Sequence, residues 1–213
     1  MQASAEPLPK ADRYRGLELE LLNTRAVLKQ VRAELARLLA DEKSARYQCL
    51  HDSLTALPNR SFFRQQLDHA LDGARESRQV LSVFYLDLDG FKALNDTHGH
   101  DAGDQVLRIV GARLARAVRA ADMVSRMGGD EFACLLAGLE NRGHLRCLAE
   151  KLSGSVCAPM KFDGIEVSIR PSIGIATFPT DAAAADSLLK SADAAMYRAK
   201  RQRTGHAFFA DHA

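Results

Sequence analysis

Apolar residues recur at a seven-residue spacing in the first part of the chain, with Glu, Arg, Lys and Gln between them. A repeat sustained over more than three heptads predicts a coiled-coil helix over residues 13–49. An amphipathic helix packed on its own domain is the alternative, because Leu19, Leu22 and Leu39 lie off the repeat. The two apolar positions are occupied by Tyr14, Leu21, Leu28 and Leu35, and by Leu17, Thr24, Val31 and Leu38.

Residues 1–12 precede this repeat and show no periodicity. Pro7 and Pro9 lie within them, and proline disfavours a regular helix interior. We therefore expect a disordered leader over residues 1–12, the coiled-coil helix over 13–49 and a globular domain over 50–213.

After residue 50 the pattern alternates between helical and extended stretches. The predicted helices begin after Asn59 or Ser61, either of which can cap the first, and near Phe91, Asp104, Arg142 and Ala183. The predicted strands cover residues 80–88, 123–125, 132–136, 160–162, 165–169, 172–176 and 206–209.

One predicted strand, residues 80–88, is apolar on both faces until Asp87. This pattern is typical of a central strand that is covered on both sides, and ligands tend to gather beyond the ends of such strands. Asp87 is therefore the best single candidate for a metal ligand. Asp89 follows, just before Gly90, and its commonest role is to cap the next helix.

The polar stretch over residues 95–104 is predicted to be a loop whose side chains can contact a ligand. Its last residue, Asp104, precedes an apolar helical pattern and can equally serve as a helix cap. The pattern leaves both roles of Asp104 open.

Two adjacent glycines, Gly128 and Gly129, separate two strand-forming stretches. Adjacent glycines permit the positive φ values of a two-residue turn, which predicts a β-hairpin. Asp130 and Glu131 follow directly, although acids are disfavoured in strands. Because glycine also lets a ligand approach the backbone closely, we interpret the turn as a metal or phosphate site. An exposed hairpin with solvated acids is the alternative.

The composition narrows the class of protein. The 213 residues are 46% hydrophobic and 26% charged, with a formal net charge of +2, which argues against duplex nucleic acid and a polybasic membrane anchor as partners. No apolar run approaches the ~20 residues of a membrane-spanning helix, and the first residues lack a signal-peptide core. The four cysteines have no C-x-x-C spacing, which favours buried free thiols. These features predict a cytoplasmic soluble protein.

The sequence Gly-Gly-Asp-Glu-Phe at residues 128–132 resembles the signature of the GGDEF family of diguanylate cyclases. Residues 52–60 resemble the family's D-x-L-T-x-L-x-N-R entrance, and residues 172–176 its S-I-G-I-A strand. Residues 86–104 match the spacing L-D-x-D-x-F-K-x-x-N-D-x-x-G-H-x-x-G-D throughout. The resemblance covers roughly residues 50–209, nearly everything after the predicted coiled coil.

The resemblance implies an α/β (α+β) domain with a central mixed or antiparallel sheet surrounded by helices, similar to polymerase palm domains and class III nucleotidyl cyclases. It also implies a bound Mg²⁺, with Mn²⁺ as the alternative. The carboxylates of Asp87 and Asp130 and the backbone carbonyl of Leu88 would hold the metal, since Mg²⁺ prefers hard oxygen donors. Glu131 would assist the metal or the ribose 3′-hydroxyl.

The resemblance further implies GTP as the substrate. Asn95 and Asp104 would recognise guanine, because a carboxylate can accept both N1–H and N2–H of the base. The loop over residues 89–92, which includes Phe91 and Lys92, would hold the triphosphate through backbone N–H groups at a helix start.

Gly128 and Gly129 would leave space for the same substrate, and Lys200 would reach its β- and γ-phosphates as a point charge. The chain departs from the family at one place, because residues 199–205 read A-K-R-Q-R-T-G where A-K-x-x-G-R-N is usual. Either Arg203 serves in phosphate binding or the phosphate-binding arginine is absent.

The implied reaction joins two GTP into cyclic di-GMP and releases two pyrophosphates. One domain offers half of the site, so a homodimer through the coiled coil is expected. Arg119 and Asp122 match the R-x-x-D spacing of the family's product-inhibition site. The alternative for this pair is a solvated helix end, where Arg119 favours the helix dipole.

Two other functions remain open. A catalytically silent domain of the same fold would bind cyclic di-GMP or GTP as a receptor, and a coiled-coil scaffold would carry a passive globular head. Silent relatives typically lose site residues, so the presence of Asp87, Asn95, Asp104, Asp130 and Glu131 argues for the enzyme.

Overall fold

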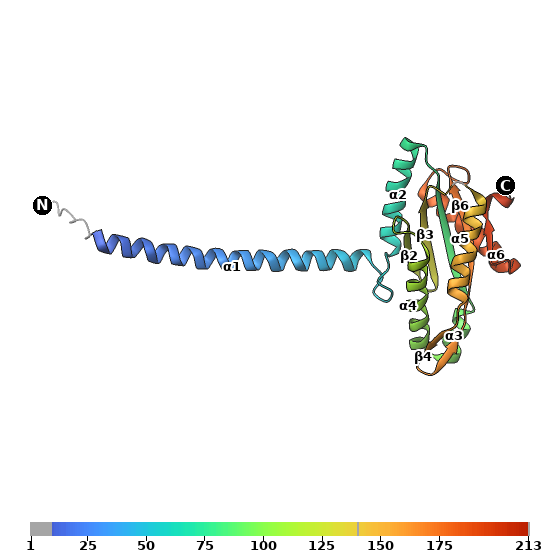
Figure 1. Cartoon of the computed structure of the whole chain (residues 1–213), viewed down its shortest axis with the longest axis horizontal. Helices are drawn as coiled ribbons and strands as arrows, with labels where there is room; N and C mark the ends of the chain where they lie inside the picture. The colour runs from blue at the N-terminus through green and yellow to red at the C-terminus, as the bar shows by residue number, and fades with distance from the viewer. Residues whose placement is uncertain (1–9, 140, 213) are drawn as a thin grey trace. The chain divides into compact units, whose positions relative to one another are not determined.

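The computed structural model describes residues 10–139 and 141–212, which contacts divide into two units at the Cys49–Leu50 junction. The first unit is formed by helix α1 (Lys10–Leu50), which is drawn in blue in Figure 1. The helix begins within the stretch predicted as a leader, and residues 1–9 of that leader lie outside the described residues.

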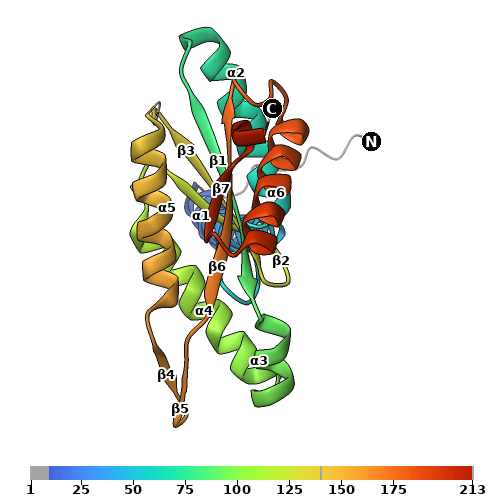
Figure 2. The same cartoon turned by 90° about the vertical axis from the view of Figure 1, so that its right-hand side faces the viewer.

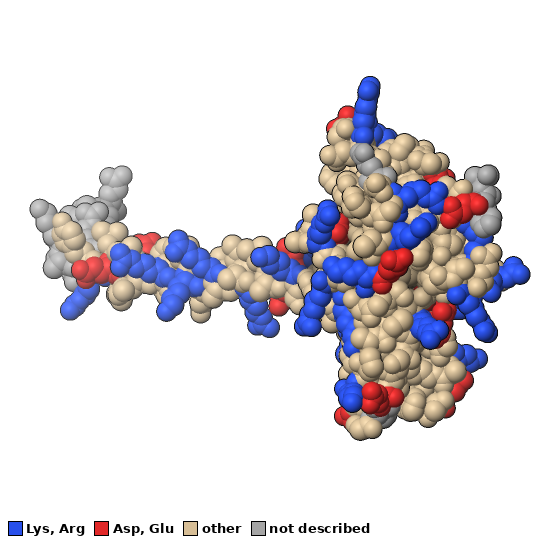
Figure 3. All heavy atoms as spheres, turned by 45° about the vertical axis from the view of Figure 1, so that its right-hand side comes forward, with Lys and Arg blue, Asp and Glu red and all other residues tan. Residues whose placement is uncertain are grey.

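The apolar positions of the heptad repeat are exposed in the single chain. Every α1 side chain that the structure describes from Tyr14 to Cys49 is exposed, and Leu21, Leu28 and Leu35 remain 51%, 47% and 55% accessible. Figure 3 shows charged side chains along this helix with uncharged surface between them. A helix of this kind presents a long apolar stripe that a second helix can cover.

The second unit contains a five-stranded sheet in the order β2-β3-β1-β6-β7. Neighbouring strands are antiparallel except for β7, which is parallel to β6, so the predicted mixed sheet is confirmed. A separate two-stranded hairpin, β4–β5, has its turn at Asp163-Gly164, between the strands predicted over residues 160–162 and 165–169. The strands are β1 (Leu81–Asp89), β2 (Met123–Gly128), β3 (Glu131–Ala137), β4 (Met160–Phe162), β5 (Ile165–Val167), β6 (Arg170–Phe178) and β7 (His206–Phe208).

Helices cover both faces of the sheet. Figure 2 shows α4 and α5 on one side of the strands and α2 and α6 on the other. Each face buries its own apolar cluster, one with the α4 and α5 side chains and one with those of α2 and α6. The helices are α2 (Arg60–Ser77), α3 (Phe91–His98), α4 (His100–Ala117), α5 (Arg142–Cys157) and α6 (Ala185–Gln202), followed by the short 3₁₀ helix η1 (Phe209–His212). Among the described residues, no helix has the length and apolar character needed to cross a membrane.

Strand β1 is central and explains the apolar run read from the sequence. Its side chains alternate between the two clusters, with Phe84 and Leu86 toward α4 and α5 and Val83 and Tyr85 toward α2 and α6. By the same alternation Asp87 belongs to the face that α2 and α6 cover. Asp87 therefore lies near the end of a buried, rigid strand.

The stretch predicted as a polar loop, residues 95–104, is mostly helical. Helix α3 continues to His98 and α4 begins at His100, so only Gly99 separates them. Because α4 begins earlier than predicted, Asp104 lies inside the helix and does not cap it. Asp, His and Gly have low helix propensity, which hid this helix start in the sequence pattern.

Two further local predictions are wrong. Asp89 is the last residue of β1 and Gly90 takes the N-cap position of α3, where no side chain caps the first turn. Arg119 does not lie in the last turn of a helix, because α4 ends at Ala117. The predicted cap of α2 is resolved in favour of Asn59, whose side chain accepts a hydrogen bond from the backbone N–H of Phe62.

Helix α6 approaches strand β6 closely at Gly174. A Cβ at this position would lie 1.9 Å from the carbonyl oxygen of Ala192 and 2.2 Å from the backbone nitrogen of Met196. Because both are backbone atoms, only a shift of the helix relieves the clash. We therefore expect Gly174→Ala to lower the free energy of unfolding by about 3 kcal/mol, the upper end of the overpacking range. Urea denaturation measures the change.

The matched control is Gly154→Ala on α5, where a Cβ meets nothing within 4 Å. There alanine should raise stability by up to about 1 kcal/mol, because it favours the helix. A Gly174→Ala variant as stable as the parent would contradict the close packing of α6 on β6.

Candidate active site

The two glycines form the turn between β2 and β3. Gly128 and Gly129 have φ values of +140° and +54°, and the pairing register shifts between Arg126 and Gly128. Such backbone angles are strained for residues that carry a Cβ, so the turn requires glycine. Asp130 lies in the turn and Glu131 opens β3, which confirms the predicted hairpin.

Asp87 and Glu131 lie directly opposite each other on β1 and β3. Opposite residues of an antiparallel pair project from the same face of the sheet, so both acids lie on the face that α6 covers. From α6, the Lys200 ammonium donates a hydrogen bond of 2.5 Å to Asp87 Oδ1. The structure thus brings together a lysine and acids that the sequence placed on three separate elements.

Asp130 shares this electrostatic environment. Burial raises the pKa of Asp130 above its usual value, and the negative charge of Asp87 raises it further. Burial alone lowers the pKa of Lys200, but the hydrogen bond and charge of Asp87, with the charges of Asp89 and Asp130, raise it. The acids therefore form a negatively charged site that Lys200 compensates in part.

Oxygen donors with this repulsion suit a divalent cation. Asp87 and Asp130 supply carboxylates, and Leu88 between the β1 acids supplies a backbone carbonyl, all hard ligands. Within the described part of the chain, no cluster of three or more His, Cys, Asp or Glu side chains could hold a metal by itself. The donor set fits Mg²⁺ or Mn²⁺ that takes its remaining ligands from water and phosphate, as Mg²⁺ commonly does.

Two further acids, Glu131 and Asp89, accept hydrogen bonds from hydroxyl groups on the neighbouring strands. Tyr85 Oη donates to Glu131 Oε2 at 3.0 Å. Ser172 Oγ on β6 lies 2.9 and 3.0 Å from the two carboxylate oxygens of Asp89. No sequence motif contains Tyr85, although the period-two alternation of a strand places it on the same face as Asp87.

A partly buried ion pair supports the signature turn. Arg126 donates to both carboxylate oxygens of Asp52 at 3.0 and 3.1 Å, and to the carbonyl oxygen of Gly129 at 3.0 and 2.8 Å. Burial by itself raises the pKa of Asp52, but hydrogen bonds from Thr55 and Arg126 outweigh it and lower the pKa. The D-x-L-T motif is therefore connected to the glycine turn through one arginine.

Asn95 and Gly103 form a second part of the candidate site, where α3 meets α4. Among the described residues, the buried Oδ1 of Asn95 has no hydrogen-bond partner. A Cβ at Gly103 would lie 1.9 Å from this oxygen, so only glycine leaves room for it. A buried acceptor without a donor costs about 1–3 kcal/mol, which a ligand N–H can recover.

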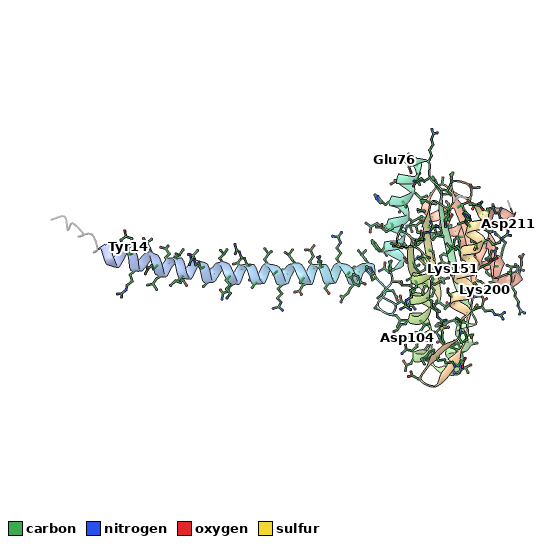
Figure 4. The ribbon with its side chains drawn as sticks, viewed as in Figure 1. Tyr14, Glu76, Asp104, Lys151, Lys200 and Asp211 are labelled. Carbon is green, nitrogen blue, oxygen red and sulfur yellow. The ribbon has the colours of Figure 1, made fainter. Side chains whose placement is uncertain are left out.

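The other predicted substrate residues lie on different elements. Asp104 is half buried on α4, whereas Lys200 belongs to α6, which is distant in the sequence. Figure 4 labels both side chains. Phe91 and Lys92 form the first turn of α3, with Phe91 partly buried and Lys92 exposed. Arg203 follows α6 with a left-handed backbone (φ +56°) and an exposed side chain.

Arg119 and Asp122 lie apart from these residues. The backbone N–H of Arg119 donates to Asp122 Oδ2 at 3.0 Å, so this carboxylate closes the turn after α4. Both residues line a cleft of about 320 Å³ that α5 borders with His144 and Lys151. The Asp122 carboxylate therefore has a structural contact, whereas the Arg119 side chain is exposed beside a cleft.

Comparison with known proteins identifies relatives for most of the second unit. Residues 49–206 match the family model described as "Diguanylate cyclase, GGDEF domain". Diguanylate cyclase TpbB of Pseudomonas aeruginosa is 44% identical over 181 residues, which are 84% of this chain. The chain spans only 42% of the length of TpbB.

Solved structures agree with the fold. The crystal structure of the GGDEF domain of TpbB is 46% identical, covers 70% of this chain and 92% of that one, and has a TM-score of 0.68. The coiled coil and GGDEF domain of DgcB from Caulobacter crescentus, in complex with c-di-GMP, is 30% identical, with a TM-score of 0.79. That structure matches 87% of this chain and 98% of its own.

Proposed function

The chain belongs to the GGDEF family of diguanylate cyclases, and from this membership we propose that it condenses two molecules of GTP into cyclic di-GMP, with release of two pyrophosphates. The observation that carries the proposal is the convergence of Asp87, Asp130 and Lys200 from β1, the signature turn and α6. A site with two acids and one cation suits a metal and a phosphate together.

The metal-holding residues follow from the donor set. Asp87, Asp130 and the carbonyl of Leu88 would hold Mg²⁺, or Mn²⁺ in its place, and Glu131 would assist the metal or the 3′-hydroxyl of the ribose. A bound divalent cation lowers the pKa of a hydroxyl group and neutralises charge on the α-phosphate. Lys200 already donates to Asp87, and an ammonium group has three donors, so it can hold a phosphate oxygen as well.

The start of α3 is open for the triphosphate. Asp89, which would otherwise compete for the first N–H groups of this helix, is held by Ser172 instead. Gly90 provides no side-chain cap, so the N–H groups of Phe91 and Lys92 can donate to phosphate oxygens. Gly128 and Gly129 on the facing turn add no side chains that would obstruct the phosphates.

Asn95 and Asp104 recognise the guanine. The buried, unpaired Oδ1 of Asn95 needs a donor, and the N–H groups at the guanine edge provide one. Asp104 accepts from the remaining N–H groups. This pairing selects GTP over ATP, because adenine lacks the N1–H and N2–H donors.

The residues at the end of α6 depart from the family pattern, so we assign the phosphate contact to Lys200 and not to an arginine after the helix. Arg203 has the left-handed backbone that usually terminates a helix at glycine, and the family pattern has glycine at this place. Thr204 then takes the place of the usual arginine, and its hydroxyl donates to the carbonyl of His206. Arg203 makes at most a supplementary contact through its exposed side chain.

The reaction requires two domains that face each other. Each domain binds one GTP and activates its 3′-hydroxyl for attack on the α-phosphate of the other. We propose that α1 provides the second domain by pairing with α1 of another copy, since its heptad leucines are exposed.

Incubation of the full chain with GTP and Mg²⁺, followed by chromatographic detection of cyclic di-GMP, tests the proposed reaction. Formation of cyclic di-GMP with release of pyrophosphate supports it. Binding of GTP or cyclic di-GMP without turnover would instead identify a receptor domain, and no binding of either would identify a scaffold.

We also propose that Arg119 binds the product at a separate inhibitory site. Its guanidinium can stack on guanine and donate to O6 and N7 of the base. Arg119→Ala should weaken binding of cyclic di-GMP by about 1–3 kcal/mol, the range for a lost bidentate base contact. Calorimetry with cyclic di-GMP measures this affinity, and the initial rate with GTP alone should hardly change.

The control is Arg116→Ala, which removes an exposed arginine from the last turn of α4. Arg119 is the better variant than Asp122, because loss of the Asp122 carboxylate would also open the turn that it closes. Equal affinities of wild type and Arg119→Ala for cyclic di-GMP would show that the R-x-x-D pair has only a structural role. An equal loss of affinity in Arg116→Ala would show the same.

A further inference from the structure

Glu131, the second acid of the signature, is held by a residue that no motif marks. Tyr85 Oη donates to Glu131 Oε2 at 3.0 Å. Tyr85 pairs with Ala133 across β1 and β3, whereas Glu131 pairs with Asp87, so the hydrogen bond runs diagonally between neighbouring pairs. Ala133 has a small side chain, which leaves room for the tyrosine to reach the acid.

The two partners differ in rigidity. Tyr85 is 7% exposed in the middle of β1, between β3 and β6, and packs in the cluster that α2 and α6 cover. Glu131 is the first residue of β3, directly after a glycine turn, and its side chain is half buried. A glutamate has three rotatable side-chain bonds, so without a partner it samples several rotamers. The hydrogen bond to the buried tyrosine therefore restricts the rotamers of Glu131.

The tyrosine hydroxyl remains a donor under working conditions. A phenol hydroxyl is a donor with an ordinary pKa of about 10, so it carries its proton at neutral pH. Since the hydroxyl keeps its proton, the carboxylate of Glu131 is the acceptor, and this bond leaves its second oxygen available.

We propose that Tyr85 is a positioning residue for the cyclase reaction, which fixes one carboxylate oxygen of Glu131 and so directs the other toward the metal or the 3′-hydroxyl. The inference rests on the proposed function, in which Glu131 serves one of these two groups. It adds a residue that does not itself touch the substrate. Orientation by such a partner typically changes activity by about 10–100-fold.

Tyr85→Phe tests the proposal with the full chain, because it removes only the hydroxyl. We expect kcat to fall about 10-fold while KM for GTP stays within about 2-fold, since substrate contacts are unchanged. Ser82→Ala is the matched control, because it removes another buried β1 hydroxyl, one without a hydrogen-bond partner among the described residues. An unchanged kcat in Tyr85→Phe, or an equal fall in Ser82→Ala, overturns the positioning role.

A double-mutant cycle tests the contact without reference to turnover. Urea unfolding of Tyr85→Phe, Glu131→Ala and the double variant should show a coupling of about 3- to 10-fold in the unfolding constant, the range for one hydrogen bond. An additive double variant overturns the contact and the proposal with it. A wild type that forms no cyclic di-GMP overturns the proposed function, and coupling in the cycle would then leave Tyr85 a structural contact only.

Discussion

Replacement of Asp130 by asparagine is expected to abolish the formation of cyclic di-GMP, with a loss of about 10³-fold or more. A metal contributes several kcal/mol of transition-state stabilisation, and each 1.36 kcal/mol changes the rate about tenfold. The asparagine would keep the size of the side chain but lose the charge that holds the cation. Asp87→Asn should lose activity to a similar extent, measured by pyrophosphate release.

The same substitution is expected to stabilise the metal-free protein. Burial and the charge of Asp87 raise the pKa of Asp130 in the folded state. A carboxyl group with a raised folded pKa contributes stability below its unfolded pKa, and this stability is lost as the pH rises through the folded pKa. At neutral pH the ionised Asp130 is therefore unfavourable, and Asp130→Asn should melt at an equal or higher temperature than wild type. The difference should vanish below the unfolded pKa of aspartate.

Asp68→Asn provides the control, because it removes an exposed acid from α2. It should leave the turnover unchanged. An Asp130→Asn variant that keeps its turnover would show that this acid is not catalytic. One that melts far below wild type at neutral pH would show that it is structural.

The parts of the fold with strong periodicity could be predicted from the sequence. The apolar run of β1 indicates a strand covered on both faces, and the adjacent glycines indicate the β2–β3 turn. The low helix propensity of the residues between Asn95 and Asp104 predicts a loop, whereas the structure has helix there. Packing decides the outcome there, since Gly103 is buried and lets α4 approach the Asn95 side chain.

The acids of the candidate site could be predicted from local patterns. Asp87 ends an apolar strand and Asp130 follows two adjacent glycines, but the residues that support these acids depend on the register of strands that lie far apart in the sequence. A shift of one residue between β1 and β3 would turn Tyr85 away from Glu131. The contact of Asp52 with Arg126 likewise depends on how the entrance of the domain meets the hairpin. No local pattern contains these contacts.

Deletion of the residues before Leu50 is expected to lower the rate per chain about 10²- to 10³-fold at micromolar protein. Without α1, two domains meet only by diffusion, whereas a short tether raises their effective concentration to the millimolar range. The truncated domain should still bind GTP, because its Asp87, Lys200 and Asn95 contacts lie within the second unit. Light scattering and rates across a dilution series measure the oligomeric state and the activity together.

A charged residue in the apolar stripe of α1 tests helix pairing without deletion of the helix. Leu28→Lys places a charge at a heptad position, and Gln30→Lys places the same charge outside the repeat. Only Leu28→Lys should produce monomers and a rate that rises with protein concentration, because a buried lysine disfavours helix pairing. Circular dichroism of both variants monitors the helix content of the chain. Equal activity of the truncated and full chains in dilute solution would exclude α1 as the element that pairs the domains.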